Sequence, residues 1–189
     1  MSTPTWKSTT RPSALRPAEP NPLRILGVDP GSLNTGWGVL TGSPANPEVV
    51  ECGLFRLEPL PTLPQRLARL QNALRDIVER LQPTAAAVES PFHGASARSS
   101  LQLAHARGVI LAVLGDAGLS VTEYAPAAIK KSVTGDGRAE KSRISAMVVQ
   151  LLGVSVEGER HDVHDALAVA LCHLSTAAFM SAVQKSIER

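Results

Sequence analysis

Acidic side chains from three distant parts of the sequence could together bind divalent metal ions. Asp29 and Glu89 each end a short apolar run and precede a proline-containing turn, so both are expected at strand ends. Asp162 and Asp165 lie three residues apart at the start of an apolar helical pattern, which places both carboxylates on one helix face. Oxygen ligands suit Mg²⁺ and Mn²⁺, and two such ions about 3.5 to 4 Å apart can activate water for phosphodiester cleavage. The four carboxylates therefore predict a metal-dependent catalytic site.

Each carboxylate also has an ordinary structural explanation. Asp29 before Pro-Gly is usual turn chemistry, and Glu89 is equally interpretable as an exposed acid at a strand end. Asp162 could cap its helix or complement the helix dipole. Capping explains one aspartate better than both, because Asp165 falls inside the first turn beside apolar residues. A carboxylate in that setting is costly without a compensating cation.

Two histidines accompany the aspartates of this helix. His161 precedes Asp165 by four residues, and a nitrogen ligand would shift the metal preference toward Mn²⁺. His161 and His164 could instead support the metal ligands, face the substrate, transfer a proton, or simply face solvent at the helix start. The sequence leaves these interpretations open.

The elements that must position these residues follow from hydrophobic periodicity. Residues 24–29 and 36–41 predict a hairpin, and apolar residues recurring every three to four positions between Leu63 and Leu81 predict an amphipathic helix. Short loops indicate that the first three strands are antiparallel, and later alternation of strands with helices indicates parallel strands. The predicted fold is α/β, with a five-stranded mixed sheet flanked by helices on both faces. The other predicted strands cover 49–57, 85–88 and 119–124, and the other helices cover 96–117, 126–133, 139–152 and 161–184.

Composition and length favour one domain. The chain has 189 residues, of which 43% are hydrophobic and 19% charged, enough for one substantial core. Residues 1–22 contain five prolines among many Ser and Thr and predict a disordered tail, the domain is expected to cover 23–180, and 181–189 are expected to form a C-terminal tail. The sequence shows neither a bilayer-length apolar run nor a signal-peptide pattern, so we expect a cytoplasmic protein without a membrane association.

Five motifs extend the pattern across most of the chain. They are Ile25-Leu-Gly-Val-Asp-Pro-Gly-Ser32 with Thr35-Gly-Trp-Gly-Val39, Ala87-Val-Glu89, Leu103-Ala-His-Ala-Arg-Gly108, Ala139-Glu-Lys141, and Asp162-Val-His-Asp-Ala-Leu-Ala168. In this order and spacing the sequence resembles the RuvC family of Holliday-junction resolvases, which are bacterial endonucleases with an RNase H-like fold. The resemblance implies that fold, and it implies catalytic carboxylates at Asp29, Glu89, Asp162 and Asp165 that hold two Mg²⁺ or Mn²⁺ ions.

The resemblance also implies partners. A family member is expected to act as a homodimer that cuts two opposing strands of a four-way DNA junction symmetrically, during homologous recombination and DNA repair. It is expected to act with a RuvA–RuvB branch-migration complex. The helix predicted over residues 96–117 is more apolar than one buried face requires, which fits a dimer contact and fits a buried core helix equally.

Basic residues supply candidate DNA contacts. Between residues 98 and 143 seven Lys and Arg residues outnumber four acids, although the net charge of the whole chain is only +2. We expect Arg98, Lys130 and Lys141 to contact DNA, and the two lysines match positions that hold junction phosphates in the family. Phe92 follows the strand end at Glu89 and is expected to stack on an opened base as in the family, unless it fills the core beneath its loop.

Two other functional classes share parts of this pattern. The segment 27–36 also resembles the first phosphate loop of actin-like ATPases and sugar kinases. Such proteins need a second phosphate loop and an adenosine-binding turn, and the sequence contains no match to either. A junction-binding dimer without nuclease activity is the second alternative, and for it we would expect at least one of the four carboxylates to be replaced.

Overall fold

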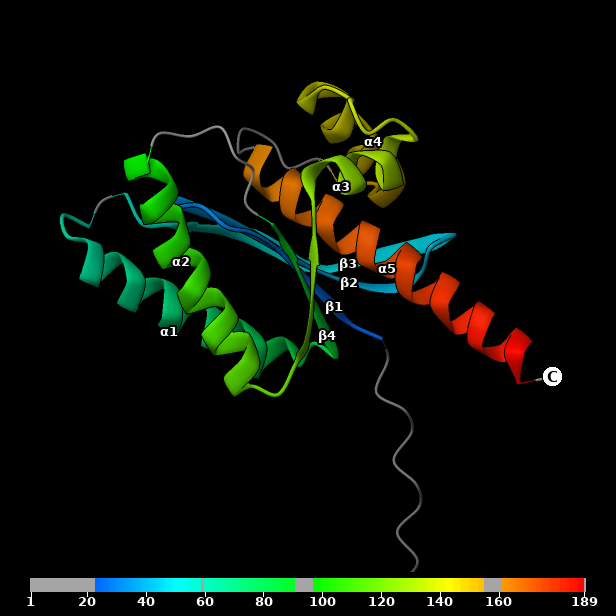
Figure 1. Ribbon diagram of the computed structural model, residues 1–189, viewed down its shortest axis with the longest axis horizontal. Coiled ribbons are helices and arrows are strands. Elements are labelled where there is room, and N and C mark those ends of the chain that lie inside the picture. The colour runs from blue at the N-terminus through cyan, green and yellow to red at the C-terminus, as the bar shows by residue number, and fades with distance from the viewer. Residues whose placement is uncertain (1–22, 59, 91–96, 155–160, 189) are drawn as a thin grey trace, which may run out of the picture.

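A five-stranded sheet with helices on both faces forms the body of the protein (Figure 1). The computed structural model describes residues 23–58, 60–90, 97–154 and 161–188, and the tail expected over residues 1–22 lies outside these ranges. The strands are β1 (Ile25–Asp29), β2 (Asn34–Ser43), β3 (Asn46–Arg56), β4 (Ala85–Glu89) and β5 (Ser120–Tyr124). The helices are α1 (Leu63–Leu81), α2 (Ala97–Asp116), α3 (Pro126–Thr134), α4 (Lys141–Leu152) and α5 (His161–Ile187).

The sheet is mixed, as predicted. Its order is β3-β2-β1-β4-β5. The pairs β1–β2 and β2–β3 are antiparallel, whereas β1–β4 and β4–β5 are parallel. Val28 of β1 lies beside Val88 of β4, so Asp29 and Glu89, the next residue of each strand, reach the same edge of the sheet. Carboxyl ends of adjacent parallel strands are where α/β proteins place their ligands.

Two apolar cores lie on opposite faces of the sheet. Alternate residues of a strand point to opposite faces, so Leu26 and Val28 pack with α1 and α2, while Ile25 packs with α3, α4 and α5. Helix α1 buries Leu70 and Leu74 from its periodic apolar stripe. Two helical layers therefore hold the sheet between them and fix the edge that carries Asp29 and Glu89.

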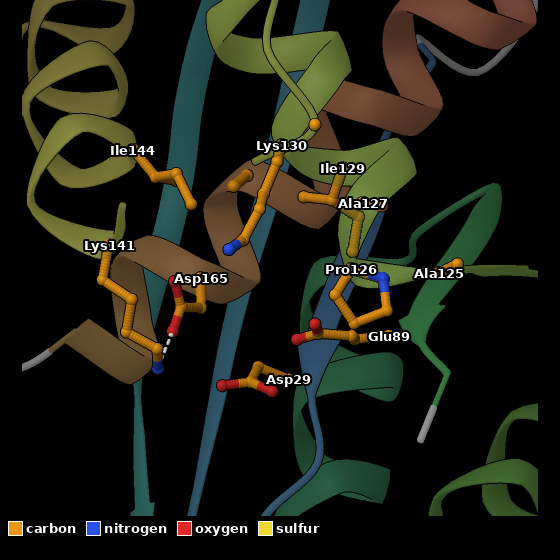
Figure 2. Close-up of a pocket in the computed structure, with 12 residues that line it drawn as sticks. Asp29, Glu89, Ala125, Pro126, Ala127, Ile129, Lys130, Lys141, Ile144 and Asp165 are labelled. Atoms are coloured by element: carbon orange, nitrogen blue, oxygen red, sulfur yellow. Dashed lines mark hydrogen bonds and ion pairs between the residues drawn. The ribbon is translucent and has the colours of Figure 1, made fainter. Parts of the chain in front are cut away.

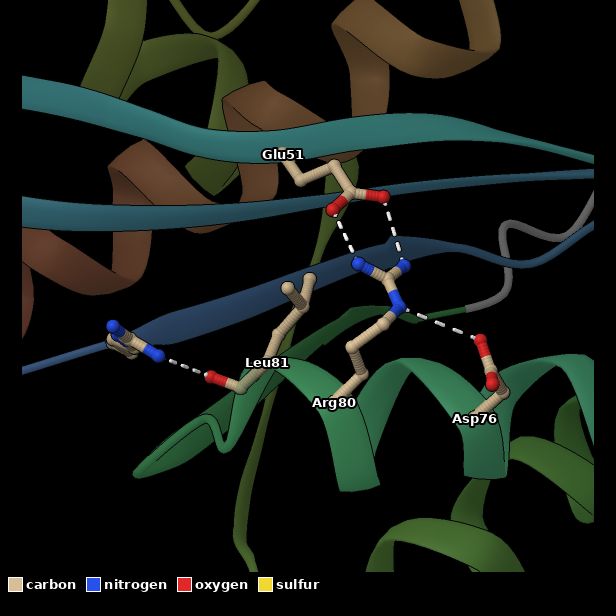
Figure 3. A network of polar contacts seen from close by, with 5 residues as sticks. Glu51, Asp76, Arg80 and Leu81 are labelled. Carbon is tan, nitrogen blue, oxygen red and sulfur yellow. Dashed lines mark hydrogen bonds and ion pairs between the residues drawn. The ribbon is translucent and has the colours of Figure 1, made fainter.

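Polar contacts join α1 to the sheet at its carboxyl end. Arg80 donates two hydrogen bonds to the Glu51 carboxylate of β3, at 2.5 and 2.8 Å, and its Nε lies 3.6 Å from Asp76 (Figure 3). The Arg24 guanidinium donates to the Leu81 carbonyl at 2.7 Å and satisfies one of the last carbonyls of the helix. The Arg80 contacts are exposed and add little stability, but they align the helix with β3.

Helix α5 crosses the sheet and contains both aspartates of the predicted site. By length and composition alone it could span a membrane, a property that core helices of globular proteins share. Its first half is such a core helix, because Leu167, Val169 and Leu174 are buried. The helix continues with exposed residues through 181–187, within the segment 181–189 that was expected to form a tail.

Glycines let α5 lie directly on the sheet. A Cβ atom at Gly27 would lie 2.3 Å from the Ala166 carbonyl oxygen, and one at Gly36 would lie 2.0 Å from the Asp162 carbonyl oxygen. Both contacts are with helix backbone, which cannot rotate away as a flexible side chain could. The absence of side chains at these glycines therefore sets the height of α5 above β1 and β2, and with it the distance from Asp29 to the aspartates of the helix.

Replacing Gly36 by Ala should move the start of α5 away from the sheet. We expect Mn²⁺ affinity, measured by calorimetry, to fall at least 10-fold, because small displacements of ligands weaken a metal site strongly. The matched control is Gly115→Ala on an exposed turn of α2, where an added Cβ meets nothing within 4 Å. That change should leave Mn²⁺ affinity unaltered and stabilise the helix slightly. Equal Mn²⁺ affinity in both variants would contradict the positioning role of Gly36.

Candidate active site

The four predicted carboxylates meet where β1 and β4 end and α5 begins. One carboxylate oxygen from each of Asp29, Asp162 and Asp165 can be chosen so that all three lie within 4.8 Å of one another. The Glu89 side chain joins this group through a hydrogen bond with Asp29. Side chains separated by up to 136 positions in the sequence, from Asp29 to Asp165, therefore share one site.

A buried threonine fixes the turn that follows Asp29. Thr35 is fully buried, and its hydroxyl donates to the Gly31 carbonyl at 2.9 Å and accepts from the Gly31 amide at 3.3 Å. These bonds close the loop between β1 and β2. The turn expected from Pro-Gly is thus present. Asp29 precedes this turn and also contributes its carboxylate to the acidic cluster.

The acidic cluster opens into a cleft of about 520 Å³ between the sheet edge and helices α3, α4 and α5. Asp29 and Glu89 lie at one end, Asp165 lies across from them, and Lys130 and Lys141 extend from the two shorter helices into the same space (Figure 2). The apolar part of the wall consists mainly of Pro126, Ile129, Ile144 and Ala168. The cleft thus combines acids at its floor with cations at its side.

Burial, together with the crowding of like charges, changes the protonation of the cluster. Burial raises the pKa of Asp29 to about 9, with further contributions from the negative charges of Glu89, Asp165 and Asp162. Burial also raises the pKa of Glu89, opposed by its hydrogen bond with Asp29. A protonated Asp29 therefore donates to the Glu89 carboxylate at neutral pH. A positive charge close to the two carboxylates would permit both Asp29 and Glu89 to ionise.

Lys141 supplies positive charge on the other side of the cluster. Its Nζ atom donates to Asp165 Oδ2 at 3.0 Å, and this hydrogen bond raises the pKa of the lysine. The lysine side chain is 66% exposed, whereas that of Asp165 is 13% exposed. Lys141 can therefore leave the aspartate and move to solvent or to a ligand without disturbing the core.

The donor set fits a hard divalent cation. All four side chains offer oxygen, the ligand atom that Mg²⁺ and Mn²⁺ accept most readily. Burial and, after it, neighbouring negative charge keep the proton on Asp29, and a divalent cation would favour the ionised carboxylate instead. Asp29, Asp162 and Asp165 have the spacing to share one ion, and Glu89 extends the set toward β5.

The other candidate residues occupy different surroundings. His161 is exposed, whereas His164 is half-buried, has a pKa lowered by burial, and has an Nε2 atom with no hydrogen-bond partner among the described residues. Arg98 is exposed in the first turn of α2, and Lys130 is half-buried in the cleft wall. Phe92 falls within 91–96, outside the described residues, so its two interpretations stay predictions.

Arg107 is a residue of this region that we did not single out as a site residue from the sequence. It lines a second, smaller cavity of about 140 Å³ on the α2 side of Asp29 and Glu89. Its guanidinium donates to the Glu89 carbonyl oxygen at 2.8 Å. The available signal was its place in the motif Leu103–Gly108, but that spacing does not reveal a contact with a strand end.

This sheet order, with antiparallel β1 to β3, parallel β4 and β5, and α5 across the sheet, defines an RNase H-like fold. Residues 25–173 match the family described as crossover junction endodeoxyribonuclease RuvC. The chain therefore belongs to the RuvC family.

Individual relatives agree with this assignment. The crossover junction endodeoxyribonuclease RuvC of Magnetococcus marinus is 41% identical over 82% of this chain and 86% of its own length. That of Anaeromyxobacter sp. strain K is 45% identical over 82% of each chain. The structure of T. thermophilus RuvC in complex with a Holliday junction substrate superposes with a TM-score of 0.78, at 26% identity, over 83% of this chain and 96% of that chain.

Proposed function

We propose that this protein resolves Holliday junctions in recombination and repair by hydrolysing phosphodiester bonds on two opposing strands of a four-way DNA junction. The observation that carries the proposal is the convergence of Asp29, Glu89, Asp162 and Asp165 in one acidic cluster. Three of them, Asp29, Glu89 and Asp165, line a cleft whose side bears Lys130 and Lys141. Family membership supports the same activity, since the relatives named above are crossover junction endodeoxyribonucleases.

In this proposal the carboxylates are the ligands of two Mg²⁺ or Mn²⁺ ions. When bound, such ions activate water and stabilise the leaving oxygen of the cleaved phosphodiester. Asp29 gives up its proton on metal binding, and Lys141 leaves Asp165 to neutralise the phosphate that enters the cleft. Lys130, directed into the same space, holds an adjacent phosphate.

Outside the cleft, two further residues contact the DNA, one through charge and one through base stacking. Arg98 contributes a cation for the phosphate backbone, and Phe92 stacks on a base at the opened branch point. His161, which is exposed, and His164, which is half-buried, support the metal ligands Asp162 and Asp165 from neighbouring positions on α5. The protein acts in the cytoplasm beside a RuvA–RuvB branch-migration complex.

A synthetic four-way junction tests the activity. Purified protein with Mg²⁺ or Mn²⁺ should cut opposing strands at paired positions, leave ends that a ligase seals, and spare a linear duplex of the same sequence. Equal cutting of junction and duplex would contradict a resolvase. Tight junction binding without cutting in either metal would favour the non-catalytic alternative.

The exposed face of α2 supports a homodimer. Leu101 is 60% exposed, and Ala104 and Gly108 are exposed one and two turns further along the same face. A Cβ at Gly108 would meet nothing within 4 Å, so a second helix can approach closely there. A twofold-related copy of this face would bring two active sites to one twofold-symmetric junction.

Replacing Gly108 by Glu should separate the subunits. We expect a monomer by light scattering, because a charge buried at the interface is strongly destabilising. Paired incision should fall at least about 10-fold, because monomers would cut single strands independently. The control Asn72→Glu places the same charge at an exposed position of a different helix, α1, and should leave the dimer intact. A Gly108→Glu protein that stays dimeric would contradict this interface.

A further inference from the structure

Arg107 joins helix α2 to the strand end that carries Glu89. Its Nη1 atom donates to the Glu89 carbonyl oxygen at 2.8 Å, and its Nη2 atom pairs with Glu123 Oε2 at 2.5 Å. The arginine side chain is only 11% exposed. One guanidinium thus holds the main chain of β4 and a side chain of β5 together, next to the acidic cluster.

The Glu89 carbonyl needs such a donor because of the surrounding strand ends. The Ser90 amide donates to the Tyr124 carbonyl at 2.8 Å, so it points toward β5. Hydrogen-bonding groups of successive strand residues alternate in direction, and the Glu89 carbonyl therefore points toward β1. The residue there that would continue the parallel ladder is Pro30, which has no N–H. Arg107 provides the donor that the ladder lacks.

The second contact of Arg107 limits its movement. A planar guanidinium held at two of its nitrogens has a fixed orientation, which a single contact would not impose. Glu123 lies on β5 beside Val88, the residue before Glu89, so the ion pair acts across the two strands at the site itself. The position of the Glu89 main chain is thereby tied to α2.

We infer that Arg107 is a positioning residue that fixes Glu89 for metal binding, an inference that rests on the proposed function. Arg107 acts through the main chain of Glu89, while the Glu89 carboxylate remains directed at Asp29. Because α2 also presents the exposed face of Leu101, Ala104 and Gly108, the same arginine links that face to the active site. A direct phosphate contact is the competing role, and its low exposure and two protein partners oppose it.

The variants are Arg107→Lys, Arg107→Met and Glu123→Gln, with Arg75→Met as the control. Arg75 also pairs with an acid, Asp116 at the end of α2, but it lies away from the acidic cluster. Mn²⁺ affinity is measured by calorimetry without DNA, junction affinity with Ca²⁺ in place of the active metal, and thermal stability in EDTA. The lysine variant keeps a charged donor and guards against loss of folding in the methionine variant.

We expect Mn²⁺ affinity to fall about 10- to 100-fold in Arg107→Met, less in Arg107→Lys and Glu123→Gln, and not at all in Arg75→Met. Junction affinity and its salt dependence should stay at the wild-type level in all of them. Unchanged Mn²⁺ affinity in folded Arg107→Lys and Glu123→Gln would overturn the inference. So would weaker junction binding with a salt slope reduced by about one, the sign of a lost phosphate contact.

Failure of the proposed function would look different. Wild-type protein that neither binds Mn²⁺ nor cuts a junction would remove the activity on which the inference depends. Wild-type protein that does both, beside Arg107 variants with undiminished Mn²⁺ affinity, would refute the role of Arg107 alone.

Discussion

Changing Asp165 to Asn is expected to reduce junction cleavage by more than about 100-fold while junction binding in Ca²⁺ is retained. The Asp165 carboxylate is 13% exposed, belongs to the cluster with Asp29 and Asp162, and accepts a hydrogen bond from Lys141. Asparagine keeps the size of the side chain and an oxygen that can accept from Lys141, but it removes the negative charge. Cleavage rate and junction affinity, measured on the same junction, separate the two effects.

The matched control is Asp116→Asn. Asp116 is also an aspartate paired with a basic residue, Arg75, but its side chain is 70% exposed at the far end of α2. Its loss should leave cleavage at the wild-type rate. If Asp165→Asn instead lost junction binding, or cut as fast as the control, a structural role would replace the proposed role as metal ligand.

Changing Asp29 to Asn is expected to stabilise the metal-free protein and to abolish cleavage. Burial and three neighbouring carboxylates raise the pKa of Asp29 from 3.8 to about 9. At pH 8 the folded protein therefore keeps a proton on Asp29 that the unfolded chain releases, which costs stability on the order of a few kcal/mol. An asparagine amide can donate to Glu89 as the protonated aspartate does, without this cost.

The pH dependence follows from the same shift. The folded protein binds the Asp29 proton more tightly than the unfolded chain does, so this contribution to stability is complete below pH 3.8 and declines as pH rises toward about 9. The asparagine variant has no proton to lose at this position. In EDTA the melting temperature of the variant should exceed that of the wild type by several degrees at pH 8, and the difference should shrink as pH falls.

Metal reverses the order of stability. Mg²⁺ should raise the melting temperature of the wild type, more at pH 8 than at pH 6, because the ion replaces the proton on Asp29. The Asp29→Asn protein should show little response. Thermal melts with EDTA and with Mg²⁺ at several pH values provide the measurement. If the melting temperature of the wild type varied with pH as that of the variant does, the raised pKa of Asp29 would be contradicted.

Local patterns predicted the elements well. The apolar repeat predicted helix α1 with both boundaries correct, because Leu70, Leu74, Ile77 and Leu81 must all face the sheet. Strand β2 is longer than predicted, Asn34–Ser43 against 36–41, since pairing with β1 on one side and β3 on the other extends it beyond its apolar centre. Helix α4 starts at Lys141, two residues later than predicted, because Glu140 has the extended backbone of an N-cap residue.

Contacts between distant elements were less predictable. Strand-end and helix-start positions identified the four carboxylates, since the sheet topology itself brings those positions together. The role of Gly36 beneath Asp162 and the contact of Arg107 with the Glu89 carbonyl depend on how α5 and α2 lie on the sheet. Spacing along α2 shows which face of the helix carries the Arg107 side chain, but it does not identify the strand end that this face meets.

The most direct test is to locate the metal ions. Crystals grown with Mn²⁺ should show one anomalous diffraction peak in contact with Asp29, Asp162 and Asp165, and a second peak in contact with Glu89. In the same crystals the Lys141 side chain should have moved away from Asp165. A Mn²⁺-soaked crystal without density at these carboxylates, while the same protein cuts junctions in Mn²⁺, would contradict the proposed metal centre.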